Sequence, residues 1–264
     1  MDFGFSRWRR ARILRKSKLD DALWREALAR HRLLDGLDAA ESDRLRERVT
    51  VFLHDKQIHG AGGLVLDEGM RISIAAQACI LLLNLPAQWY DDWVEIIVYP
   101  AEFLPPVQWE DEYGVVHEGR EIHAGEAWLR GPVILSWADM GEDFADGINV
   151  AIHEFAHKID MLNGDADGFP PLHAGMSRKA WTRAFSAAYA DFCAKVDKDV
   201  EVDIDPYAAD SPGEFFAVTS EVFFERPEIL LAIYPEVYAQ LAAFYRQDPY
   251  ARHRAAGLLA EAPG

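Results

Sequence analysis

The stretch HEFAH, residues 153–157, contains the residue types and the spacing that most clearly allow chemistry. If the stretch is helical, His153 and His157 lie one turn apart on one face, so both imidazoles can reach the same metal ion. Glu154 would lie near that ion but angled away from it. It could take a proton from a water molecule and later hand it to a leaving amine. The stretch predicts a zinc-binding helix with its own general base; the alternative, two ordinary surface histidines, leaves the position of Glu154 to coincidence.

A catalytic zinc site needs a third protein ligand from elsewhere in the chain. The extended motif HExxHxxGxxH is excluded, because Asp160 and Asn163 occupy its later positions. A thermolysin-like arrangement is disfavoured, because residues 171–185 contain no carboxylate. The next candidates are Glu214 and Glu221.

Both glutamates lie in DPYAADSPGEFFAVTSEVFFERP, residues 205–227. Ser211 as N-cap and Pro212 as first helical residue predict the start of a helix, on which glutamates seven apart share a face. However, Glu214 also completes the capping box S-P-G-E, in which the glutamate bonds back to the cap's backbone. The local sequence therefore leaves open whether Glu214 is a ligand or a cap. If Glu214 is a cap, Glu221 is the substitute ligand. Otherwise Glu221 is exposed, or it contacts a metal ligand without binding the metal itself.

The HEFAH helix needs an apolar face that packs it into the core. Four apolar residues recur with helical spacing: Ile152, Phe155, Ala156 and Ile159. The two histidines and Asp160 form a neighbouring stripe. Asp160, one turn beyond His157, could orient that imidazole, or it could bond loop amides at the helix end.

The remaining chain predicts an α+β fold. Residues 20–60 have helical spacing of apolar residues, GAGG at 60–63 interrupts it, and an apolar helix follows near 72–85. Three short β-branched or aromatic runs bounded by Pro and Gly predict strands: residues 93–100, 114–119 and 132–137. The HEFAH helix, a loop at 163–173 and further helices complete the chain.

We expect one domain over residues 21–264, with an upper lobe (21–162) that carries the sheet and the HEFAH helix. A helical lower lobe (163–264) would supply the third ligand. Residues 1–20 are expected to form a basic, flexible tail, since residues 6–18 contain seven Lys or Arg and no acid. Such a tail could also touch anionic lipid or an acidic partner.

Composition narrows the function classes. The net charge of −17 and the pI of about 4.9 disfavour nucleic-acid binding. We see no secretory signal, and the longest apolar run is too short for a membrane span. The two cysteines, Cys79 and Cys193, form no CxxC pair, so we expect a cytoplasmic protein without disulfides.

Several longer stretches together resemble the Mlc titration factor A family of bacterial zinc peptidases. The resemblance covers nearly all of the chain after the first twenty or so residues. The matching stretches are VEIIVYPAEF (94–103), GPVILSW (131–137), HEFAHKIDMLNGD (153–165), YAADSPGEFFAVTSEVFF (207–224) and FYRQDP (244–249). The resemblance implies a zincin-like fold with a small mixed sheet. Its edge strand, PVILSW (132–137), would precede the HEFAH helix and pair with an extended peptide substrate.

The same resemblance implies roles for five residues. One Zn²⁺ per chain would be held by His153, His157 and Glu214. Glu154 would be the general base, and Tyr207 would donate a hydrogen bond to the oxyanion. The Tyr-x6-Glu spacing of Tyr207 and Glu214 also occurs in lethal-factor-type toxin peptidases.

The function that the resemblance implies is an aminopeptidase-type zinc peptidase acting on short peptides. The amine-binding GxMEN-type motif of large aminopeptidases is absent, so terminus preference does not follow from the sequence. The alternative is a regulatory protein that sequesters a transcriptional repressor of sugar uptake, with or without proteolysis.

Overall fold

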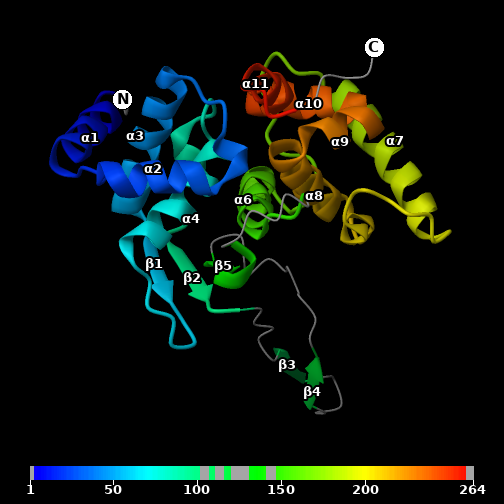
Figure 1. Cartoon of the computed structure of the whole chain (residues 1–264). Coiled ribbons are helices and arrows are strands. Elements are labelled where there is room, and N and C mark those ends of the chain that lie inside the picture. The colour runs from blue at the N-terminus through cyan, green and yellow to red at the C-terminus, as the bar shows by residue number, and fades with distance from the viewer. Residues whose placement is uncertain (1–2, 102–106, 111–115, 120–130, 141–146, 260–264) are drawn as a thin grey trace.

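Helices form most of the molecule, which is described here by a computed structural model covering residues 3–101, 107–110, 116–119, 131–140 and 147–259 (Figure 1). The first part of the chain contains α1 (Phe3–Lys16), α2 (Asp21–Arg30), α3 (Ala39–Asp55) and α4 (Glu68–Leu81). The central part contains α5 (Trp137–Met140) and α6 (Val150–Asp160). The last part contains α7 (Arg178–Val196), α8 (Pro212–Glu225), α9 (Pro227–Ile233), α10 (Pro235–Tyr245) and α11 (Pro249–Ala255). In Figure 1, α6 and α8 lie between the first four helices and α7.

Two strand pairings build a small parallel sheet that leads into α6. The strands are β1 (Gln57–Gly60), β2 (Glu95–Tyr99) and β5 (Val133–Ser136), in the order β1-β2-β5 with both pairs parallel. Ile96 and Val98 of β2 are completely buried, as expected for the central strand of a parallel sheet. Among the described strands, β5 lies at one edge and precedes α5 and α6, as predicted for the strand before the HEFAH helix.

The strands differ from the sequence analysis in two respects. The described three-stranded sheet is parallel throughout, not mixed; the antiparallel pair, β3 (Val107–Glu110) and β4 (Val116–Gly119), forms a separate sheet. β1 and β3 were not predicted. β1 contains one buried residue, Ile58, so its sequence shows no alternation, and its pairing with β2 is what makes it a strand.

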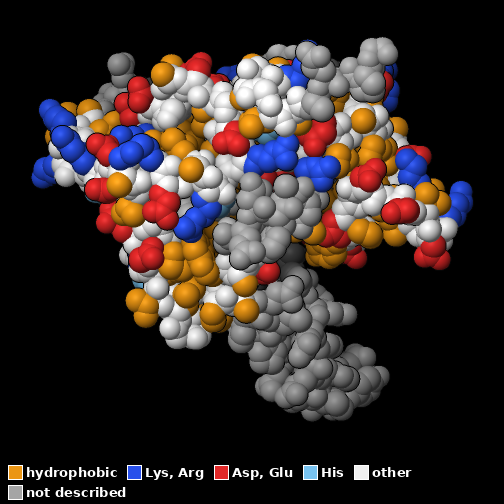
Figure 2. All heavy atoms as spheres, viewed as in Figure 1, with side chains coloured by type: hydrophobic (Ala, Val, Ile, Leu, Met, Phe, Trp, Pro, Cys, Tyr) orange, Lys and Arg blue, Asp and Glu red, His pale blue; other side chains and the backbone are white. Residues whose placement is uncertain are grey.

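The basic N-terminal segment also differs from the expected flexible tail, because residues 3–16 form α1. Arg9 donates two hydrogen bonds to the carboxylate of Asp55, and Arg10 donates one to Glu47 at 2.7 Å, both acids being on α3. Ile13 is buried. Lys and Arg side chains gather at the edge of the molecule where α1 lies (Figure 2). A basic helix can be ordered there because acids on the neighbouring helix neutralise part of its charge.

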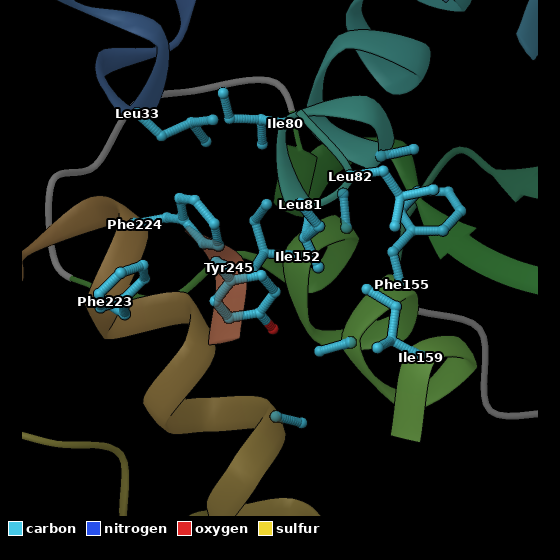
Figure 3. Close-up of a cluster of buried hydrophobic side chains, with 14 of the residues drawn as sticks. Leu33, Ile80, Leu81, Leu82, Ile152, Phe155, Ile159, Phe223, Phe224 and Tyr245 are labelled. Carbon is cyan, nitrogen blue, oxygen red and sulfur yellow. The ribbon is translucent and has the colours of Figure 1, made fainter. Parts of the chain in front are cut away.

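The hydrophobic core surrounds α6. All four residues of the expected apolar stripe, Ile152, Phe155, Ala156 and Ile159, are completely buried. Figure 3 shows α6 side chains beside the end of α4 and beside Phe223, Phe224 and Tyr245 from α8 and α10. Because this face is fixed by packing, the polar stripe of α6 has a defined direction.

Proline starts four successive C-terminal helices. α8, α9, α10 and α11 each begin with proline, whose missing N–H costs nothing at that position. The last helix, α11, contacts the segment after α2: the guanidinium of Arg252 donates to the carbonyls of Leu33 at 2.8 Å and Asp35 at 3.1 Å. In the described part of the chain, no helix has the length and hydropathy required to cross a bilayer.

Candidate metal centre

Helix α6 brings two imidazoles to one point. Asn149 caps the helix, its side chain accepting a hydrogen bond from the N–H of Ile152 at 2.9 Å. His153 and His157 follow one turn apart, with ring centroids separated by 4.7 Å. Their Nε2 atoms are 3.1 Å apart, and the two rings meet edge to face.

Helix α8 supplies a carboxylate to the same point. Ser211 caps α8 and accepts from the N–H of Glu214 at 3.1 Å, and Pro212 is the first helical residue, as the sequence predicts. The carboxylate oxygen Oε2 of Glu214 lies 3.0 Å from Nε2 of His153 and 3.3 Å from Nε2 of His157. Among the described hydrogen bonds, no bond returns from Glu214 to the backbone of Ser211, so only half of the capping box forms. In α3 both halves form, between Asp38 and Glu41.

The three facing atoms fit a single metal ion. One nitrogen or oxygen from each of His153, His157 and Glu214 lies within 4.8 Å of the others. Their separations of 3.0, 3.1 and 3.3 Å are close to the ~3.3 Å between ligands in a tetrahedron with zinc bonds of about 2.0–2.1 Å. Two imidazole nitrogens and a carboxylate oxygen are also a donor set that divalent transition metals accept.

The electrostatics favour positive charge at this point. Burial lowers the pKa of His153, but hydrogen bonds with Glu214 and Glu221 raise it to about 10. Burial raises the pKa of Glu214, whereas hydrogen bonds with His153 and His157 lower it to about 2. A positively charged His153 and a negatively charged Glu214 therefore stabilise each other.

Glu221 lies behind His153 and not beside Glu214. Its Oε1 is 2.7 Å from Nδ1 of His153, the ring nitrogen that points away from the other two ligands, and its Oε2 accepts from the backbone N–H of Asn149. Burial raises the pKa of Glu221, while the hydrogen bonds from His153 and Asn149 lower it. Of the alternatives that the sequence leaves open for Glu221, the structure shows the one in which it contacts a candidate ligand, His153.

Asp160 bonds a loop amide at the end of α6, which is the second of the two roles predicted for it. It is fully buried, and its Oδ2 accepts from the N–H of Gly168 in the following loop at 2.7 Å. Burial raises its pKa to about 7. The Nδ1 of His157 has no hydrogen-bond partner among the described residues. Asp160 thus fastens the loop to the helix end instead of orienting His157.

The remaining two predicted residues flank the cluster. Glu154 is half-buried on α6, close enough for its charge to raise the pKa of His153 and of Tyr207. Tyr207 lies in a short 3-10 helix (Pro206–Ala209), with its ring centroid 6.1 Å from that of His153 and 42% of its surface exposed. Burial and the charge of Glu214 raise the pKa of Tyr207 to about 12, so its hydroxyl stays protonated.

Asn149, which caps α6 and contacts the acids of α8, was not among the predicted site residues. Its side-chain Nδ2 donates to Glu225 at 2.6 Å and to Gln77 at 2.9 Å. An asparagine just before a predicted helix is a recognisable N-cap signal. Its contacts with α4 and α8 have no local signal.

Comparison with known proteins identifies a family and close relatives. A family model described as glucose-regulated metallo-peptidase M90 matches residues 5–246. A Mlc titration factor A from Salmonella arizonae is 40% identical over 240 residues, which are 89% of this chain and 94% of the relative. Proteins of the same name from Klebsiella pneumoniae and Cronobacter sakazakii are 37% identical over 238 residues and 38% identical over 234 residues. These alignments cover 89% and 88% of this chain and the same shares of the relatives.

Proposed function

The chain belongs to the glucose-regulated metallo-peptidase M90 family, and from this premise we propose that it is a zinc-dependent peptidase with a zincin-like fold. One Zn²⁺ per chain would be held by His153, His157 and Glu214. The observation that supports this most strongly is the convergence of their three donor atoms, 3.0–3.3 Å apart, from two helices. The site would lie where the upper lobe (21–162), with α6, meets the lower lobe (163–264), with α8.

Zinc, when bound, would act as a Lewis acid that makes a water molecule more acidic and polarises the scissile carbonyl. Glu154 is the general base in this proposal: it accepts a proton from the attacking water and later delivers it to the leaving amine. Its place directly after His153 supports the role, because it brings the carboxylate next to the ligands without making it one of them.

Tyr207 acts on the oxygen of the reacting carbonyl in this proposal. Its hydroxyl donates a hydrogen bond to the oxygen on which negative charge develops. A pKa raised to about 12 supports this role, because the hydroxyl keeps its proton at the pH where Glu154 is to act as a base. The partial exposure of Tyr207 is consistent with a side chain that meets a substrate.

The substrate would be a short peptide cleaved in the manner of an aminopeptidase. β5, at the edge of the parallel sheet and just before α6, could hold an extended peptide by strand addition. We place the activity in the cytoplasm. The two free thiols, Cys79 and Cys193, are compatible with a reducing compartment.

Metal analysis combined with peptide hydrolysis by wild type and Glu154→Gln tests the proposal. We expect one zinc per chain in both proteins and a loss of about 10²- to 10⁴-fold in kcat for Glu154→Gln. A peptide series with free and blocked N-termini measures the terminus preference. Glu236→Gln, the same change at an exposed glutamate on α10, is the matched control and should behave as wild type. Equal turnover by wild type and Glu154→Gln would rule out this mechanism.

A second function is favoured by the name of the relatives, Mlc titration factor A. We propose that the chain can also bind a transcriptional repressor of the Mlc type, which requires no catalysis. Capture of such a repressor by the Glu154→Gln protein would separate binding from cleavage. If purified repressor binds neither protein, the peptidase proposal stands alone.

A further inference from the structure

We propose that Glu221 is a positioning residue that fixes the ring of His153, and that Asn149 in turn anchors Glu221. The inference rests on the proposed metal site and adds a requirement to it. The site would depend on a buried acid that touches no metal and on the cap of the helix that carries the ligands.

Both oxygens of Glu221 are used as acceptors. Oε1 faces Nδ1 of His153 at 2.7 Å, and Oε2 accepts from the backbone N–H of Asn149. Only 4% of Glu221 is exposed, so water cannot readily replace either partner. A carboxylate in this position keeps a proton of His153 on Nδ1, so Nε2, which faces Glu214 and His157, is the ring nitrogen left to bind a metal ion. Such a partner fixes both the tautomer and the direction of a ligand imidazole.

Asn149 connects this acid to two further helices. Its Nδ2 donates to Glu225 of α8 and to Gln77 of α4, while its Oδ1 accepts from the N–H of Ile152 in α6. Gln77 and Glu225 are also buried. The carboxylate of Glu221 is therefore held against a point where α4, α6 and α8 are joined, and it does not move with its own helix alone.

The two ligand histidines differ in this respect. Nδ1 of His157 has no hydrogen-bond partner among the described residues, whereas Nδ1 of His153 has Glu221. The ring of His157 faces the other two ligands through its Nε2 atom. Among the described residues, a hydrogen bond to the outer ring nitrogen therefore orients only one of the two ligand histidines, His153.

A glutamine at position 221 tests this arrangement, because it is isosteric but has one acceptor oxygen. Two donors, His153 Nδ1–H and Asn149 N–H, face the side chain. If the amide oxygen accepts from Asn149, the amide NH₂ faces Nδ1 and favours the tautomer with the proton on Nε2. That proton lies on the atom that must bind the metal, so Glu221→Gln should weaken metal binding.

Glu225→Gln is the matched control, one helical turn further along α8 and also buried. Oε1 of Glu225 accepts from Nδ2 of Asn149, and a glutamine oxygen can accept the same bond. This change replaces a buried carboxylate of the same helix by an amide, keeps an acceptor for Asn149 and places no donor against His153.

The experiment measures the Zn²⁺ dissociation constant of the full chain by competition with a chromophoric chelator. The visible spectrum of the Co²⁺ form and the thermal unfolding of the metal-free proteins are recorded alongside. We expect Glu221→Gln to bind Zn²⁺ about 10- to 100-fold more weakly than wild type, with an altered Co²⁺ spectrum, and Glu225→Gln to bind nearly as tightly as wild type. A purely structural role would lower the unfolding temperature of the metal-free proteins and leave the Co²⁺ spectrum unchanged.

Three outcomes would overturn the inference. Zn²⁺ binding by Glu221→Gln equal to that of wild type would show that His153 does not depend on Glu221. Equal weakening in both variants would show that the loss of buried charge, and not the hydrogen bond to His153, is responsible. A wild type that binds no Zn²⁺ would instead overturn the proposed function, and the role of Glu221 with it.

Discussion

Two regions of the molecule place a histidine of low exposure near a glutamate, and they differ in whether the carboxylates reach the ring. Between α6 and α8, carboxylates lie 3.0 Å and 2.7 Å from the two ring nitrogens of His153. Where α11 meets α9 and the first helices, His253 is completely buried, and no carboxylate of the described residues forms a hydrogen bond with its ring. Hydrogen bonds with two acids raise the pKa of His153 to about 10, whereas burial, together with the charges of Arg252 and Arg32, lowers the pKa of His253 to about 4.

This difference separates a binding site from a packed interior. Burial alone keeps an imidazole neutral, because the charged form loses its hydration. In the first region, two acids of α8 reverse that effect, and one of them, Glu214, converges with both imidazoles on one position. In the second, Glu228 lies near enough to influence His253, but its Oε1 accepts from Arg226 at 2.9 Å and its Oε2 has no described partner. A histidine and a carboxylate in one neighbourhood therefore indicate a metal site only when their donor atoms converge.

The largest effect is expected from removing the shared carboxylate of the first region. Glu214→Ala should lose more Zn²⁺ affinity than the about 10- to 100-fold expected for a supporting residue, because two imidazoles alone leave the coordination incomplete. Equilibrium dialysis with metal analysis gives the affinity, and circular dichroism shows whether the variant is folded.

Glu221→Ala is the informative companion to Glu214→Ala, since both residues contact His153 from the same helix. Normal metal binding by Glu214→Ala together with loss of metal in Glu221→Ala would mean that the ligand assignment is reversed.

The next largest effect is expected from Tyr207→Phe, which removes one hydroxyl beside the first region and leaves the ligands intact. We expect kcat to fall about 10²-fold or more, because one hydrogen-bond donor to a developing oxyanion is lost. Zn²⁺ affinity should not change. Steady-state kinetics on a short peptide, together with the chelator competition, separates these quantities. Unchanged kcat would mean that the hydroxyl of Tyr207 does not take part in the reaction.

Much of the first region could be predicted from the sequence because its signals are local. The spacing of His153 and His157, the apolar stripe beside them and the Ser211–Pro212 helix start each depend on a few neighbouring residues. The strands β2 and β5 have the same basis, since both lie in β-branched runs.

The features of the fold and the site that could not be predicted depend on contacts between distant segments of the chain. Whether Glu214 turns to its own cap or to the histidines is decided by where α6 lies, which the S-P-G-E stretch does not contain. β1 becomes a strand through its pairing with β2, and α1 is held by acids on α3. Residues 6–18 show basic charge without its partners, so they predict a tail where the structure has a helix.

The smallest effect, and the one that tests the second region, is expected from His253→Leu. The two side chains have similar volume, so the change should cost less than about 1.5 kcal/mol at neutral pH and leave Zn²⁺ affinity unchanged. The free energies of unfolding should diverge as the pH falls. The unfolded chain takes up a proton on this histidine near its ordinary pKa of 6.5, and the folded protein does so only near pH 4.

Wild type should therefore lose stability relative to His253→Leu between about pH 6.5 and 4, by up to about 3 kcal/mol. His31 and Asp160 also have shifted pKa values, but they are present in both proteins, so their contributions cancel in the difference. Urea unfolding of both proteins across this pH range measures the divergence. Parallel curves would mean that His253 is not held neutral by burial. In that case hydrogen bonds with acids would no longer be the feature that distinguishes His153 from His253.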